Sequence, residues 1–288
     1  MGRTKSRWFL ALSLFGCLGA HAAGPVWAIH GAHNTVYLAG SVHVLPQDEK
    51  LPPAFDRAYA DSSKLVMEID LAKLDQMDAA SWMAEHGTLA PGERLQTLVG
   101  AQTYARVTAV ATELQLPMMM LDHQAPWIVG IEISGKAYEQ AGYSPEQGVE
   151  EQLLARVQAD HKPTDGLETL QEQLGGLIAL PPNDQAHLLE QSMDDLKTLD
   201  ADLKDVLAAW RHGDAARLAN LLSSEYDSFP ALYRPLVTDR NQRWLPQIEQ
   251  LLKGNENVMV VVGSLHLVGK GGLLELLRKD GYPGSQLN

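Results

Sequence analysis

Hydrophobic residues form short continuous runs near both ends of the chain and recur at helical spacing between them. Residues 258–262 are five apolar residues, four of them valine, and such a run predicts a strand that is buried on both faces of a sheet. Residues 36–39 predict a second buried strand. Each run leads into a glycine that is followed three positions later by a histidine, which gives two pairs: Gly40 with His43, and Gly263 with His266.

The two copies of this Gly-x-x-His pattern predict a shared site. His43 and His266 lie 223 residues apart in the chain, so their imidazoles meet only if the two strands are neighbours in one sheet. The alternative is a pair of buried histidines that bond to backbone carbonyls. Because each histidine follows a glycine at the carboxyl end of a strand, where open α/β sheets bind ligands, we expect a joint site.

The rest of the pattern predicts a mixed α/β fold with strands at both ends and a long helical middle. Residues 26–29 are expected to form a hairpin with the strand at 36–39, and residues 64–70 a strand beside it, joined by a right-handed crossover. Residues 163–167 predict a further short strand. Helices are expected at 54–62, 95–116, 146–160, 170–180, 184–211, 215–223, 235–253 and 273–279, and a helical segment at 117–138 that is divided at Pro126.

Two features of this helical middle bear on its organisation. Met118, Met119 and Met120 are expected to fill a gap in a helical core, the alternative being a patch that binds a soft metal. No segment resembles a linker between independent domains, so we expect residues 23–288 to form a single domain.

The N-terminus has the layout of a secretory signal peptide, which we assign to residues 1–22. Three basic residues precede an apolar run at 8–20 that is too short to span a membrane, and small residues at Ala20 and Ala22 fit a cleavage site. We therefore expect a periplasmic or secreted protein; lipid attachment at Cys17 is the alternative. Cys17 is the only cysteine, so any metal ligands of the mature chain must be nitrogen and oxygen atoms.

The charge balance limits the partners. With 36 acidic and 23 basic residues the net charge is −13, which argues against binding nucleic acid or anionic lipid through bulk charge. No other apolar run reaches bilayer length, so we expect no integral membrane segment in the mature chain. The expected partner is a peptide or small-molecule substrate in the cell envelope.

Carboxylates near the paired histidines are candidates for a third metal ligand. Two neutral imidazoles and one carboxylate leave positions on a divalent ion for water and substrate. Glu68 is the leading candidate, because it ends a strand that we expect beside the strand of Gly40, and Asp70 follows on the same face as a supporting group. Glu168 is a further candidate, as base or ligand. The alternatives are a solvated acid for Glu68 and a helix N-terminal carboxylate for Glu168.

Six motifs in this order resemble the TraB/GumN family, which is related to the Tiki proteins. They span residues 37–43, 66–70, 166–169, 211–214, 240–241 and 262–269, so the resemblance covers nearly all of the expected mature chain. It implies a mixed α/β sheet with helical insertions, similar to the fold of the erythromycin esterases. Tiki relatives are regarded as metal-dependent proteases that use both Gly-x-x-His motifs and an acidic residue.

The resemblance also implies roles for individual residues. His43, Glu68 and His266 would be metal ligands, and Glu168, Arg240 and Asn241 would be other polar residues of the site. The alternative for Arg240 is a cation on a helix surface, and for Asn241 a local helix cap. Neighbouring positions on a helix point about 100° apart, so these two need not both face the site.

The combined expectation is an exported metal-dependent hydrolase that acts on a peptide bond. Glu68 or Glu168 would handle the proton and Arg240 would stabilise the oxyanion, with zinc, manganese or cobalt as the ion. The chain lacks the His-Glu-x-x-His helix of common zinc proteases. Protease activity therefore rests on the resemblance, and the alternative is a non-catalytic periplasmic protein that binds metal, haem or a peptide.

Overall fold

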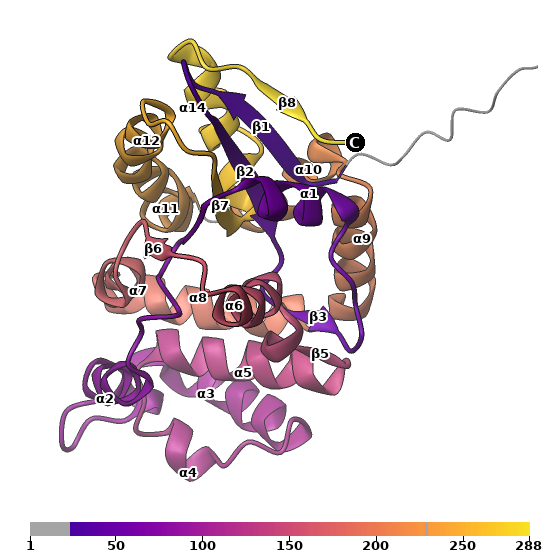
Figure 1. Ribbon diagram of the computed structural model, residues 1–288. Helices are drawn as coiled ribbons and strands as arrows, with labels where there is room; N and C mark the ends of the chain where they lie inside the picture. The colour runs from indigo at the N-terminus through magenta and orange to yellow at the C-terminus, as the bar shows by residue number, and fades with distance from the viewer. Residues whose placement is uncertain (1–23, 228–229) are drawn as a thin grey trace, which may run out of the picture.

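The computed structural model describes residues 24–227 and 230–288, and the expected signal peptide lies outside these ranges. Its centre is a six-stranded mixed sheet in the order β6-β4-β7-β2-β1-β8 (Figure 1). This confirms the mixed α/β fold. The strands are β1 Val26–His30, β2 Thr35–Ser41, β4 Lys64–Met67, β6 Thr164–Gly166, β7 Val258–Gly263 and β8 Gly284–Gln286.

The two strands that carry the Gly-x-x-His pattern are neighbours, as predicted. β2 and β7 pair in parallel, with Gly40 opposite Val262 and Ser41 opposite Gly263. The hairpin of β1 and β2 is also confirmed. All six residues of β7 are buried, and because successive side chains point to opposite faces, both faces of the sheet are covered at this strand.

The predicted position of the Glu68 strand is wrong. β4 does not adjoin β2, because β7 lies between them and pairs in parallel with both. A strand as uniformly apolar as β7 is most stable with a neighbour on each side. Glu68 still reaches the same edge of the sheet, since β4 and β7 run in the same direction.

Helices cover the sheet and build a separate cluster beyond its carboxyl edge. The α-helices are α1 Pro53–Asp61, α2 Gln76–Gly87, α3 Leu95–Glu113, α4 Met118–Leu121, α5 Pro126–Gln140, α6 Val149–Asp160, α7 Leu170–Ile178, α8 Pro182–Asp195, α9 Leu199–Arg211, α10 Ala215–Asp227, α11 Pro230–Tyr233, α12 Asp239–Leu252, α13 Ser264–Leu267 and α14 Leu273–Lys279. A 3₁₀ turn η1 (Pro145–Gln147), a π-helix η2 (Arg234–Thr238) and the short pair of strands β3 (Leu45–Pro46) and β5 (Tyr143–Ser144) complete the fold.

The single helix expected over residues 184–211 is two helices. α8 and α9 are separated at residues 196–198, although this stretch contains neither proline nor glycine. The two helices belong to different cores: Leu189 packs in the helical cluster with α3 and α5, whereas Trp210 packs in the core around the sheet. The chain must change direction between the two cores, and hydrophobic periodicity does not reveal such a change.

The methionine run is only partly buried, which corrects the core assignment. Met118 packs against the helical cluster, but Met119 and Met120 are 81% and 59% exposed. The short helix α4 presents one residue in this run to the core and turns the next two outward. In the described part of the chain, no helix is both long enough and apolar enough to cross a membrane.

Candidate functional site at the carboxyl ends of the parallel strands

The three predicted metal ligands meet beside Gly263, the last residue of β7. A Cβ atom added to Gly263 would lie 3.3 Å from Nε2 of His43, 3.4 Å from Oε1 of Glu68 and 3.6 Å from Cδ2 of His266. His43 follows β2 by two residues, Glu68 follows β4 directly, and His266 lies in α13, which begins after β7. The structure therefore brings together side chains that come from three adjacent parallel strand ends.

The other glycine of the pair makes room for the second copy of the motif. A Cβ atom on Gly40 would lie only 2.8 Å from Oγ of Ser264. That hydroxyl donates to the carbonyl oxygen of Ser41 at 2.9 Å. Each glycine thus accommodates residues of the opposite Gly-x-x-His copy, and this explains why both positions lack a side chain.

Glu68 is a buried carboxylate that accepts three hydrogen bonds. Oε1 accepts from the backbone N–H of Gly263 (2.7 Å), and Oε2 accepts from Nε2 of Gln173 (2.9 Å) and from Nη2 of Arg240. Burial raises the pKa of Glu68, but nearby His266, Arg240 and His43 outweigh this effect and lower it to about 2. The side chain is therefore ionised at neutral pH.

His266 is buried and is held in one orientation by Asn241. The amide nitrogen of Asn241 donates to the carbonyl oxygens of His266 (3.2 Å) and Gly271 (2.9 Å). Its Oδ1 therefore faces Nδ1 of His266, 2.8 Å away, and accepts a hydrogen bond from it. We assign the tautomer with hydrogen on Nδ1, which leaves a lone pair on Nε2. Burial lowers the pKa of His266 to about 4, so the ring is neutral at pH 7.

Arg240 links the buried acidic groups to this histidine. Nε and Nη2 donate to Oε1 of Glu168 at 2.9 and 2.6 Å, and Nη2 also donates to Glu68. Nη1 donates to the carbonyl of Leu236 (3.2 Å) and to Nε2 of His266 (3.0 Å). All five N–H groups of the guanidinium are thereby engaged, and Arg240 holds Glu68, Glu168 and His266 in fixed positions.

Glu168 is the second buried carboxylate. Besides Arg240, its Oε2 accepts from Nε1 of Trp244 at 3.2 Å, and the exposed Arg243 lies 3.6 Å away. Burial is the main influence on Glu168 and raises its pKa, although Arg240 acts in the opposite direction. Thr169, not Glu168, caps α7, so Glu168 serves the site and not the helix dipole.

His43 is the exposed member of the group. Its side chain is 64% exposed, and its Nδ1 lies 2.8 Å from Oε1 of Glu150, whose side chain is only 16% exposed. The negative charge of Glu150 raises the pKa of His43 to about 9. The site therefore has a buried floor of Glu68, Arg240 and His266 and an exposed histidine at its mouth.

The sequence did not predict three residues of the site, and one residue that it did predict makes other contacts than expected. Glu150, Gln173 and Trp244 contact the predicted ligands or their partners. The only signal for Glu150 is its place in the first turn of a helix that begins after Gly148. Asp70 was expected to support Glu68. It pairs instead with Nζ of Lys73 at 2.6 Å.

The donor types at the site fit a divalent ion. His43 and His266 both have Nδ1 against an oxygen acceptor. Metal-binding histidines usually donate such a hydrogen bond through the ring nitrogen that does not bind the ion. In residues 24–227 and 230–288, no three His, Cys, Asp or Glu side chains stand ready as a complete ion site. Arg240 already bonds His266 and Glu68, so an ion that binds Nε2 of His266 would have to displace Arg240 from this nitrogen.

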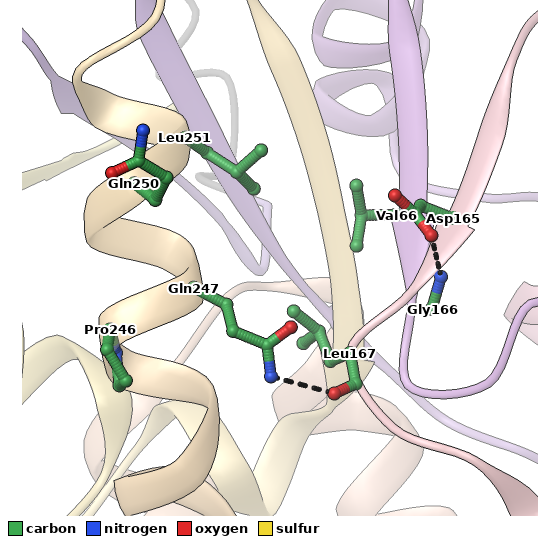
Figure 2. Close-up of a pocket in the computed structure, with 8 residues that line it drawn as sticks. All are labelled: Val66, Asp165, Gly166, Leu167, Pro246, Gln247, Gln250 and Leu251. Atoms are coloured by element: carbon green, nitrogen blue, oxygen red, sulfur yellow. Dashed lines mark hydrogen bonds between the residues drawn. The ribbon is translucent and has the colours of Figure 1, made fainter.

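A groove of about 420 Å³ lies beside this site, between α12 and the β4–β6 edge of the sheet. Figure 2 shows Gln247 crossing it, with Nε2 donating to the carbonyl oxygen of Leu167 at 2.8 Å. Its described lining includes none of the seven residues predicted for the site. Leu167 directly precedes Glu168, so the groove flanks the site along β6.

Comparison with known proteins shows the family of this chain. The model of the TraB/PrgY/gumN family matches residues 25–285. The chain belongs to this family. It is similar to "Uncharacterized protein YbaP" of Escherichia coli (strain K12) and of Shigella flexneri, each 24% identical over 243 residues, which cover 84% of this chain and 87% of the relative. No solved structure matches. The family predicted from the six motifs is thus confirmed.

Proposed function

We propose that this family member is a metal-dependent hydrolase of the cell envelope that cleaves peptide bonds. The observation that carries the proposal is the matched orientation of His43 and His266. Both rings are held at Nδ1 by an oxygen acceptor, and both lie with ionised Glu68 around one point beside Gly263. Two oriented imidazoles and one carboxylate are the donor set of many catalytic zinc sites.

His43 Nε2, Glu68 and His266 Nε2 would hold the ion, which we expect to be zinc, manganese or cobalt. A divalent ion in such a site lowers the pKa of a bound water and polarises a carbonyl group. The raised pKa of His43 means that ion binding must release a proton from that ring. Loading is therefore expected to be stronger at higher pH within the stable range of the protein.

The two buried carboxylates have different roles in this proposal. Glu68, with a pKa of about 2, is a poor proton acceptor and serves as a permanent negative charge. Glu168, whose pKa is raised, is the better candidate to accept the proton of the attacking water and to return it to the leaving amine. Arg240 has no N–H left for an oxyanion. We therefore propose that it positions Glu68, Glu168 and His266.

Metal analysis followed by a peptide-library digest tests the proposal. The purified protein should contain a stoichiometric divalent ion, cleave library peptides, and lose cleavage in chelator. Glu168→Gln should retain the ion but lose most of the cleavage, whereas Glu151→Gln, at an exposed position of α6, should behave like the parent. Retained metal with no cleavage of any peptide would favour the non-catalytic binding protein.

Export is a second part of the proposal and has its own test. A fusion of residues 1–30 to a reporter that is active only outside the cytoplasm should be active. A full-length cytoplasmic product would contradict it, and lipid on Cys17 would place the protein at a membrane surface.

A further inference from the structure

The first turn of α6 is fitted closely against the segment that carries His43. A Cβ atom on Gly148, the N-cap of α6, would collide with the carbonyl oxygen of His43. The next backbone N–H, that of Val149, donates to the carbonyl oxygen of Val42 at 3.2 Å. Glu150 follows and places its carboxylate 2.8 Å from Nδ1 of His43. The N-cap and the first two residues of α6 therefore define the position of the His43 segment.

Glu150 is much more buried than His43, and this distinguishes the pair from an ordinary surface ion pair. Ion pairs between two solvated side chains contribute little and exchange freely with water. Here the carboxylate is only 16% exposed while the imidazole is 64% exposed. A buried, oriented carboxylate that holds an exposed ring restricts the ring, because the ring has no comparable packing of its own.

We infer that Glu150 is a positioning residue, which accepts a hydrogen bond from Nδ1–H of His43 and thereby keeps Nε2 directed at Gly263 and Glu68. An exposed imidazole without this acceptor can rotate about its Cβ–Cγ bond and present either nitrogen to the site. With the acceptor in place, Nε2 lies 3.3 Å from the position of a Cβ atom on Gly263. The role of Glu150 in ion binding rests on the proposed function, but its effect on the ring does not.

Glu151 provides a matched control for Glu150. Both acids lie in the first turn of α6, so removing either one takes the same charge from the helix N-terminus. Glu151 is exposed, whereas Glu150 contacts His43. A difference between Glu150→Ala and Glu151→Ala therefore reports the contact with the histidine and not the stability of the helix.

Nitrogen-15 correlation spectra of the histidine side chains test the inference on the full, metal-free protein. The His43 signal is assigned by its absence in His43→Gln. The parent and Glu151→Ala should show a protected Nδ1–H for His43, Glu150→Ala should lose it, and Glu150→Gln should keep it because an amide oxygen can still accept. A protected Nδ1–H in Glu150→Ala would overturn the inference.

Zinc titration provides the second readout. Glu150→Ala should bind Zn²⁺ about 10- to 100-fold more weakly than the parent, the usual effect of losing the partner of a metal-binding histidine, and Glu151→Ala should match the parent. Equal affinities in both variants would overturn the role in ion binding. If the parent itself binds no Zn²⁺, the proposed function fails, and the Nδ1–H spectra alone decide whether Glu150 positions His43.

Discussion

Gly263 of the second Gly-x-x-His copy faces His43 of the first: a Cβ atom on this glycine would lie 3.3 Å from Nε2 of the histidine. The backbone of the second copy thus lines the site, and the first copy contributes its histidine side chain to the same site. The site depends on the parallel pairing of β2 and β7, and any side chain at position 263 would extend into it.

Alanine substitutions at the two glycines should have different effects. Gly263 has φ −49° and ψ 137°, which alanine adopts readily, so Gly263→Ala should fold but bind Zn²⁺ more weakly because the new methyl group crowds His43 and Glu68. Gly40→Ala places Cβ 2.8 Å from Oγ of Ser264 and should cost about 1–3 kcal/mol of stability through overpacking. Urea unfolding and calorimetric zinc titration of both variants measure this. Equal loss of stability in the two would contradict the distinction.

Stability in acid should report the burial of His266. Its pKa falls from 6.5 to about 4 in the folded protein, so below pH 6.5 the unfolded chain binds a proton that the native state does not. The free energy of unfolding of metal-free protein should therefore fall by about 2–3 kcal/mol between pH 6.5 and 4.5. Below this pH window, protonation of Glu68, whose pKa is about 2, lowers the free energy of unfolding further.

The control for this pH effect is His266→Gln, which has no titrating ring at that position. Its stability should be lower than that of the parent at pH 7 but should change less between pH 6.5 and 4.5. Urea unfolding in chelator at half-unit pH steps provides the measurement. Parallel curves for the parent and the variant would show that His266 does not titrate as a buried neutral ring.

Arg240 and Arg243 offer a matched pair for the buried ion network. Both lie near Glu168, but the side chain of Arg240 is 8% exposed and that of Arg243 is 46% exposed. Arg240→Met should cost about 3–5 kcal/mol, because it removes the buried cation that bonds both Glu68 and Glu168. Arg243→Met should cost less than about 1 kcal/mol. Chemical unfolding of the two variants measures the difference, and similar costs would argue against the network as described.

The sequence predicted the parts of the fold that depend on local pattern. The apolar runs of β2 and β7 and the repeated motif led to their pairing, and the spacing of α6 and α14 led to those helices. β8 was missed because Gly284–Gln286 is mostly exposed and has no apolar residue. The place of β7 between β2 and β4 was missed because the order of strands in a sheet depends on long-range packing, which a local pattern does not contain.

The residues of the site, like the fold, were predicted where a local pattern marks them and missed where only packing selects them. The sequence predicted His43, Glu68, His266, Glu168, Arg240 and Asn241. Hydrogen bonds link the last five, whereas His43 bonds to Glu150 and only lies near Glu68 and His266 beside Gly263. Glu150 could not be distinguished from Glu151 by residue type or spacing, since only the packing of Gly148 against His43 selects it. Arg240 and Asn241 both face the site, because Arg240 reaches Glu68 and Glu168 while Asn241 points to the backbone of α13.

X-ray absorption of the zinc-loaded protein tests the central claim most directly, that His43, Glu68 and His266 bind one ion. The parent should show two imidazoles and at least one oxygen ligand at about 2.0–2.2 Å. His43→Ala and His266→Ala should each lose one imidazole and much of the affinity while remaining folded, and Glu68→Gln should weaken binding more than Asp70→Asn. A zinc shell without imidazole, or the same shell in the parent and both histidine variants, would contradict the account.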